Sequence, residues 1–347
     1  MTSDTGLVLV TGGSGFIAGH IILQLLDHGH PVRSTLRSLG KEDEVRRVLA
    51  GAGMREGAAL EFVQADLTAD NGWADALRGV DHVLHVASPV RLGRVRNEDD
   101  VILPARDGAL RVLRAARDAG IGRVVLTSAF HAVGFGHPRT DHVFTDDDWS
   151  IIDGPGIDAY GKSKILAEQA AWDFVRTDGR GLELTTILPV AVMGPVMGRD
   201  ISGANHIVQS MLDGSMRAAP NLAVPIVDVR DVAAAHLAAM TATDAAGQRF
   251  LISTGEPAIA MVAIAQILRE NLGDTARAVP TRTLPDVVVR VAARFRPEYR
   301  SAAAELGFVK QTSNEKARRI LGIAPRPARK AIVAAGESMI ASALVSH

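Results

Sequence analysis

The stretch VLVTGGSGFIAGH, residues 8–20, decides the fold expected of this chain. An apolar, β-branched run at 7–11 leads directly into a glycine-rich turn, and a segment with helical periodicity follows at 16–28. Glycines permit a tight turn and let the backbone approach a pyrophosphate, whose charge is stabilised by N–H groups at the start of a helix. This strand, turn and helix therefore predict a dinucleotide site. The residues expected to form it are Gly12, Gly13, Ser14, Gly15, Phe16 and Ile17.

Strand-like and helix-like segments alternate along the next part of the chain. Short apolar, β-branched runs recur at 7–11, 32–36, 60–65, 82–87, 123–128 and 182–188. Helical periodicity lies between them, at 16–28, 41–50, 98–119 and 158–177. The runs are too apolar for a sheet with one face in water, so they indicate a parallel sheet covered on both sides. We predict an α/β fold with a Rossmann-type, doubly wound parallel sheet.

Prolines and glycines interrupt this alternation after Leu188. Two later runs, 224–229 and 248–253, are expected to return to the main sheet, and further helical patterns occupy 258–272, 284–296 and 329–345. The sequence therefore predicts a dinucleotide-binding domain over 1–189, with returns at about 224–253. Residues 190–223 and 254–347 are expected to form a smaller, discontinuous C-terminal lobe that binds the substrate.

The composition excludes several kinds of function. The chain has 347 residues, of which 38 are Lys or Arg and 39 are Asp or Glu, so a net charge of -1 offers no broad attraction to nucleic acid or an anionic membrane. There is no cysteine, and the histidines lack carboxylates at metal-ligand spacing, so no metal site is expected. No secretory signal or membrane-spanning run is found. We expect a soluble, cytoplasmic monomer or homodimer with a small-molecule partner.

The residue that closes the second strand indicates which cofactor is bound. An acidic side chain there holds a ribose 2′-hydroxyl, whereas a basic one accommodates a 2′-phosphate. This chain has Arg37, so NADP(H) is preferred and NAD(H) is the alternative, in which Arg37 is only a solvated surface residue. Asp66 is placed to accept from the adenine amino group, with a backbone contact from Leu67, unless it merely forms a turn. Ala87 and Ser88 are expected beneath the ribose.

Tyr160 and Lys164 form the candidate proton-transfer pair. They lie four positions apart in a strongly helical segment, so their side chains share one face. A phenol has a pKa near 10, and a neighbouring ammonium is expected to lower it towards the working range. Lys164 is also expected to hold nicotinamide ribose hydroxyls, while Tyr160 donates a proton to a substrate carbonyl oxygen as hydride reaches the carbon.

These motifs together resemble the extended short-chain dehydrogenase/reductase family, and within it the dihydroflavonol reductase and cinnamoyl-CoA reductase-like branch of the NAD-dependent epimerase/dehydratase superfamily. The segments that carry the resemblance, in family order, are TGGSGFIAGH, STLRS, ADL, HVASP, RVVLTS, YGKSKILAEQAAWDF, ILPVAVMGP and VDVRDVAAAHL. The resemblance implies NADPH-dependent carbonyl reduction, with Pro189 and Val192 at the nicotinamide. Asp231 and His236 fall in a family segment, and we interpret them as a helix N-cap and a satisfied core histidine.

One position departs from the family pattern. Relatives end the fifth strand with Thr-Ser-Ser, and the second serine donates to the substrate oxygen; this chain has Thr127-Ser128-Ala129. Loss of such a donor can cost roughly 10²–10³ in rate. Thr127 is expected to contact the cofactor. We take Ser128 as the third catalytic residue, which requires the strand end to bend. His131 is the alternative hydrogen-bond donor. A third possibility is slow catalysis without either donor.

The function predicted is reduction of an aldehyde or ketone on a small, moderately apolar molecule. Two other enzyme functions share the fold and the Tyr–Lys pair: an NAD-dependent sugar-nucleotide epimerase and a hydroxysteroid-type dehydrogenase. A protein of another class also stays open, a non-catalytic NADP(H) sensor, for which Ala129 is the one hint.

Overall fold

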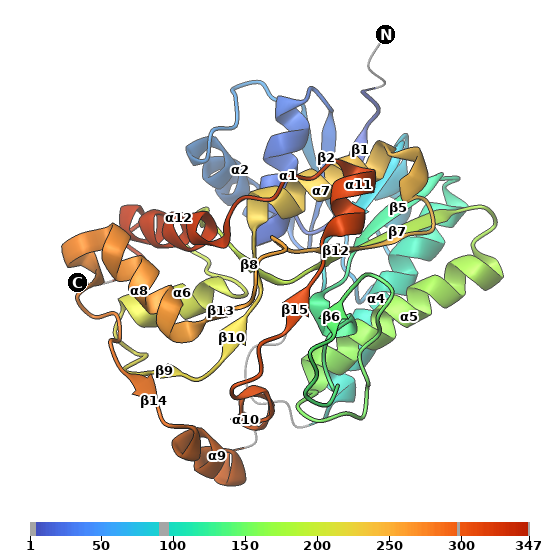
Figure 1. The fold of residues 1–347 in the computed structure, drawn as a ribbon. Helices are drawn as coiled ribbons and strands as arrows, with labels where there is room; N and C mark the ends of the chain where they lie inside the picture. Colours follow the sequence, from blue (N-terminus) through green and yellow to red (C-terminus); the bar gives the residue numbers. More distant parts are fainter. Residues whose placement is uncertain (1–4, 90–96, 297–298, 346–347) are drawn as a thin grey trace.

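A seven-stranded sheet forms the centre of the computed structural model, which describes residues 5–89, 97–296 and 299–345. The strands follow the order β12-β7-β5-β4-β1-β2-β3, and all paired neighbours run parallel (Figure 1). The chain order reverses between β1 and β4, where α/β sheets bind ligands. The predicted fold class is confirmed. The strands are β1 (Val8–Val10), β2 (Val32–Leu36), β3 (Leu60–Gln64), β4 (His82–His85), β5 (Arg123–Thr127), β7 (Glu183–Pro189) and β12 (Arg249–Ile252).

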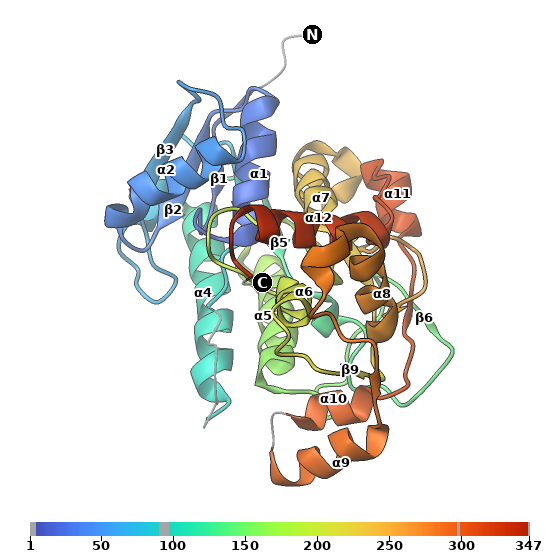
Figure 2. The same ribbon diagram turned by 90° about the vertical axis from the view of Figure 1, so that its left-hand side faces the viewer.

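Helices cover both faces of this sheet, as its apolar strands require. One face carries α1 (Phe16–Asp27), α2 (Glu42–Gly51), α7 (Val229–Thr241) and α11 (Glu315–Leu321). The other carries α3 (Trp73–Leu77), α4 (Asp99–Asp118) and α5 (Ala159–Asp178). Figure 2 shows α4 and α5 as long neighbouring helices on their side of the molecule.

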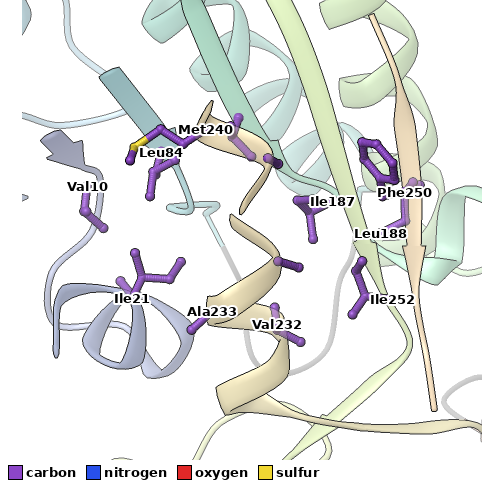
Figure 3. Close-up of a cluster of buried hydrophobic side chains, with 14 of the residues drawn as sticks. Val10, Ile21, Leu84, Ile187, Leu188, Val232, Ala233, Met240, Phe250 and Ile252 are labelled. Atoms are coloured by element: carbon purple, nitrogen blue, oxygen red, sulfur yellow. The ribbon is translucent and has the colours of Figure 1, made fainter. Parts of the chain in front are cut away.

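Each face has its own apolar core. Figure 3 shows side chains of α1 and α7, such as Ile21 and Val232, directed at strand residues that include Leu84 and Ile187. Trp73, Leu113 and Phe174 belong to the core on the opposite face. Burying apolar side chains on both faces holds the carboxyl ends of the strands in fixed positions, and these ends carry the candidate site.

A smaller C-terminal lobe has a third core. It is built from β8 (Ala191–Met193), α6 (Asn205–Leu212), β9 (Ala219–Pro220), β10 (Ala223–Val224), β11 (Ile226–Asp228), β13 (Ile259–Ala260), α8 (Met261–Leu272), β14 (Thr283–Leu284), α9 (Asp286–Phe295), α10 (Arg300–Glu305) and α12 (Ala328–Ala341). α6, α8 and α12 surround its buried centre (Figure 1). Within the described residues, no helix combines the length and apolarity needed to cross a bilayer.

The structure differs from the sequence-based expectation in two segments. The expected return of residues 224–229 to the main sheet is wrong: β11 pairs with β8 in a separate two-stranded sheet. Both edges of β7 are already taken, by β5 and β12, so no position beside it is left for β11. In the C-terminal part, β15 (Gln311–Thr312) pairs with β6 (Val143–Phe144), and α11 joins the main core. We keep the two-part division as a proposal, with residues 311–323 assigned to the main domain.

Candidate active site

The glycine turn between β1 and α1 is closely packed. Gly12 has φ +76°, a left-handed conformation, and its N–H donates to Thr35 Oγ1 at 2.9 Å. A Cβ atom at Gly13 would lie 2.4 Å from Ser34 Oγ, so a larger residue does not fit there. The N–H of Gly15 donates to the Gly12 carbonyl at 2.8 Å, which closes the turn.

The first turn of α1 has open hydrogen-bond donors. Gly15 is its N-cap and provides no side-chain cap, and no acidic residue occupies the first turn. The N–H groups of Phe16 and Ile17 donate to no acceptor in the described part of the chain. Free amides at the positive end of a helix dipole form an anion site, so this turn fits a pyrophosphate.

Arg37 and Asp66 lie side by side at the ends of β2 and β3. The exposed Arg37 guanidinium makes no hydrogen bond or ion pair with any described residue, so it is available to a phosphate. Asp66 Oδ1 accepts from the N–H and hydroxyl of Thr68, both at 2.8 Å, and these bonds hold the pKa of Asp66 below its usual value. Asp66 therefore does form a turn, while its other carboxylate oxygen stays open. The Leu67 carbonyl accepts from Arg111, and its N–H donates to no residue that the structure describes.

Ala87 and Ser88 connect the glycine turn with α5. A Cβ atom at Gly12 would lie 2.9 Å from Cβ of Ala87, so the two backbones are in close approach. Ala87 and Ser88 also line a small cavity of about 20 Å³ together with Lys164. The nucleotide turn and the helix with the proton-transfer pair therefore meet at one edge of the sheet.

The start of α5 positions Tyr160 and Lys164. Asp158 caps the helix by accepting from the Gly161 N–H at 2.8 Å, so Tyr160 lies in the first turn and Lys164 one turn later. Nζ of Lys164 is 5.8 Å from the centre of the Tyr160 ring. Neither the phenol hydroxyl nor the ammonium hydrogen-bonds to a residue that the structure describes. Both groups are thus free to bind a ligand.

Burial dominates the ionisation of this pair. It raises the pKa of Tyr160 to about 12, and Asp158 contributes in the same direction. Burial also lowers the pKa of Lys164 to about 8, against the opposing effect of Glu168. The expectation that the pKa of Tyr160 lies below its usual value is wrong, because burial disfavours the charged phenolate and raises this pKa. At neutral pH the phenol carries the proton that it would donate.

Thr127 and Ser128 point to opposite faces of the sheet, as strand alternation requires. The Thr127 hydroxyl lies 2.7 Å from Nε2 of His236, whose Nδ1 is 2.8 Å from the Val232 carbonyl. A carbonyl only accepts, so Nδ1 carries the ring proton and Thr127 donates to Nε2. His236 is the satisfied core histidine that was predicted, and the single hydroxyl proton of Thr127 is used in this hydrogen bond. Ser128 donates its hydroxyl to Glu168 Oε2 at 2.6 Å, away from Tyr160.

Glu168 was not anticipated from the sequence. Its carboxylate is almost fully buried and also accepts from Thr186 at 2.9 Å, Trp172 at 3.2 Å and Arg249 at 2.8 Å. Its place one helical turn beyond Lys164 was visible as a Tyr-x-x-x-Lys-x-x-x-Glu series on one helix face. The buried guanidinium that pairs with it comes from a distant strand, so no sequence spacing marked the pair.

Three residues carried over from the family pattern lie at the end of β7 or after it in the chain. Pro189 is the last residue of β7, and Val192 is a partly buried residue of β8. The predicted N-cap role of Asp231 is wrong, because Asp228 caps α7 by accepting from the Arg230 N–H at 2.9 Å. Asp231 instead accepts from the backbone N–H of Arg326 at 2.6 Å and pairs with its guanidinium.

The fold and the site define a class of protein: a Rossmann sheet with an open glycine turn beside a Tyr–Lys pair is the arrangement of a dinucleotide-dependent oxidoreductase. The model of the NAD dependent epimerase/dehydratase family matches residues 8–253, and the chain belongs to this family.

Two of the relatives that match this chain are named as reductases. Ketoreductase azaE of Aspergillus niger is 31% identical to this chain, and the match spans 97% of this chain and 98% of the relative. Cinnamoyl-CoA reductase 1 of Arabidopsis thaliana is 35% identical, with 70% of this chain matching 69% of the relative. The structure of Gre2 from Candida albicans in complex with NADPH has a TM-score of 0.77 at 26% identity, over 97% of this chain and 99% of that one. The predicted family resemblance is confirmed.

Proposed function

We propose that this protein is an NADPH-dependent reductase of an aldehyde or ketone on a small, moderately apolar molecule. One observation carries the proposal: the unpaired hydroxyl of Tyr160 and ammonium of Lys164 lie at the same sheet edge as the open amides of α1. A nucleotide-binding protein without catalysis has no need of a protonated phenol beside a buried, unpaired lysine.

The residues present fit NADP(H). The Phe16 and Ile17 amides would hold the pyrophosphate, and the unpaired Arg37 guanidinium would hold the 2′-phosphate. The open oxygen of Asp66 would accept from the adenine amino group. NAD(H) would leave Arg37 without a partner. The bound NADPH of the Candida albicans Gre2 structure supports the same choice.

The chain's own groups supply the proton. When bound, the reduced nicotinamide supplies a hydride to the carbonyl carbon. Tyr160 donates its phenolic proton to the carbonyl oxygen, and at neutral pH it is in the required state because burial raises its pKa to about 12. Lys164, one turn along the same helix face, stabilises the phenolate that results. The named reductase relatives support reduction as the physiological direction.

NADPH consumption by the purified protein tests this function. The wild type and Tyr160→Phe are compared with a panel of aldehydes, ketones and β-keto esters, and NADPH binding is measured by calorimetry. We expect turnover by the wild type and a kcat lowered by about 10²–10⁴ in the variant, with NADPH affinity little changed, because the phenol acts as the proton donor.

Other outcomes identify the alternatives. Purification with bound NAD and activity on a nucleotide sugar would indicate an epimerase, and NAD-dependent oxidation of a hydroxysteroid would indicate the dehydrogenase. Tight NADPH binding without turnover of any carbonyl would indicate a cofactor sensor.

A further inference from the structure

A second hydrogen-bond donor beside Tyr160 would stabilise the charge that develops on the substrate oxygen during carbonyl reduction, and the strand end does not provide a hydroxyl. Ala129 has only a methyl group there. Ser128 and Thr127 each have one hydroxyl proton, and both protons are committed, to Glu168 and His236 respectively. A carbonyl oxygen that gains negative charge is therefore left without a hydroxyl partner from β5.

His131 lies at the required place. It belongs to the 3₁₀ helix Phe130–Ala132 that directly follows β5. The His131 and Tyr160 rings meet edge to face, with centroids 4.9 Å apart and planes 82° apart. The imidazole is only partly buried, and its nitrogens form no hydrogen bond with a residue in the described ranges. An unpaired donor thus lies next to the unpaired phenol.

Stacking on an aromatic ring holds the orientation of this imidazole. His131 stacks on Phe135 with centroids 4.2 Å apart and planes 8° apart. Nζ of Lys310, from the C-terminal part of the chain, lies 3.7 Å from the centre of the same Phe135 ring. One face cannot hold both groups, so Phe135 is enclosed between His131 and Lys310. Lys310 is itself buried and paired with Glu305, which fixes the stack.

The imidazole is neutral at physiological pH. Burial lowers the pKa of His131 to about 4, Lys310 and Lys164 act in the same direction, and only Asp158 opposes them. A neutral imidazole has one N–H donor and one acceptor nitrogen. It can therefore donate a hydrogen bond without competing with Tyr160 as the acid.

We propose that His131 is a catalytic residue that donates a hydrogen bond to the substrate carbonyl oxygen, in the place left without a serine hydroxyl at Ala129. The inference rests on the proposed reductase function. His131 keeps its proton throughout: the hydride goes to carbon, the proton of Tyr160 goes to oxygen, and the imidazole only stabilises the charge that develops on that oxygen.

The test compares donor-free and donor-retaining variants. His131→Phe keeps an aromatic ring on Phe135 but has no N–H, and we expect it to lower kcat by about 10²–10³ with the NADPH Kd unchanged. His131→Leu repeats the loss without a ring, in case the first variant folds poorly. Adding Ala129→Ser to His131→Phe restores a hydroxyl at the strand end and is expected to recover part of the lost kcat.

A matched control removes another histidine of the same loop. His137 binds backbone carbonyls of Val133 and Trp149, away from Tyr160, and His137→Phe is expected to keep kcat within about twofold of the wild type. Wild-type kcat in both donor-free variants would overturn the inference, and a hundredfold loss in Ser128→Ala alone would assign the role to Ser128. Failure of the wild type to reduce any carbonyl would instead refute the reductase function.

Discussion

Glu168 and Arg249 form an ion pair between α5 and β12, with Oε1 and Nε 2.8 Å apart and side chains 1% and 10% exposed. The guanidinium also donates to the carbonyls of Asp146 and Asp148, at 2.7 Å each, and lies 3.7 Å from the Trp149 ring centre. The pair thus joins α5, β12 and the loop that follows β6. It also accounts for Ser128, whose hydroxyl is the fourth donor to Glu168 and not a group presented to Tyr160.

Glu168→Gln is expected to lower the free energy of unfolding by roughly 3–5 kcal/mol, because it leaves the buried guanidinium without its counter-charge. Urea unfolding measures the effect. Asp173→Asn is the control, since Asp173 and Arg176 form a pair on the same helix with side chains about 70% exposed. Its expected effect is within about 0.5 kcal/mol. Equal losses in the two variants would contradict a special role for the buried pair.

Arg37→Ala is expected to raise the Kd for NADPH by roughly 10- to 100-fold and to leave the Kd for NADH nearly unchanged, because only NADPH offers a 2′-phosphate to the guanidinium. Calorimetric titration with both cofactors gives the two constants. Arg55→Ala, which removes an exposed arginine paired with Asp27, controls for the general loss of positive charge. An equal rise in the Kd values for NADPH and NADH in Arg37→Ala would show that Arg37 does not bind the 2′-phosphate.

Lys164→Met is expected to abolish reduction and yet to stabilise the fold near neutral pH. Burial lowers the pKa of Lys164 from 10.5 to about 8, so the folded state holds this proton less tightly than the unfolded state. The cost of the buried charge is fully present below about pH 8 and disappears as the pH rises towards the pKa of the unfolded chain. We expect a gain of up to about 3 kcal/mol at low and neutral pH.

Urea unfolding at about pH 7 and about pH 10 checks this, since the gain should be smaller at the higher pH. Lys162→Met on the same helix is the control, because it removes a lysine that is paired with Glu98 at 2.6 Å. A gain for Lys164→Met that does not change with pH would mean that packing, and not desolvation of the ammonium, is responsible.

His20→Gln is expected to reduce the acid sensitivity of the protein. His20 is a residue of α1, and its Nε2 lies 3.0 Å from the Pro195 carbonyl in the loop after β8. Burial lowers the pKa of His20 from 6.5 to about 4. As the pH is lowered, the unfolded state therefore binds this proton at a higher pH than the folded state does. The contribution of His20 to the free energy of unfolding is fully present above about pH 6.5. It is lost as the pH falls towards 4, by up to about 3 kcal/mol.

Glutamine keeps an N–H donor for Pro195 but does not titrate, so the loss between these pH values should be smaller in the variant. Urea midpoints across this range measure it. His28→Gln is the control, since His28 is exposed at the end of α1. An identical acid profile for wild type and His20→Gln would contradict the prediction.

Local sequence patterns were enough to predict the sheet, the glycine turn and the Tyr–Lys pair. Strand alternation, a run of glycines before a helix and a four-residue spacing each depend on neighbours in the chain, so they can be read without knowledge of the fold.

Contacts between distant segments could not be read in this way. The contact of Lys310 with Phe135, the buried pair of Glu168 and Arg249, and the pairing of β11 with β8 join residues between 35 and 175 positions apart, which no local period marks. Ionisation depends on the same contacts, because burial by the whole fold, and not the neighbouring lysine, sets the protonation state of Tyr160. The amino-acid sequence thus specified which chemical groups are present, whereas three-dimensional packing determined which of them are free to bind a ligand or to transfer a proton.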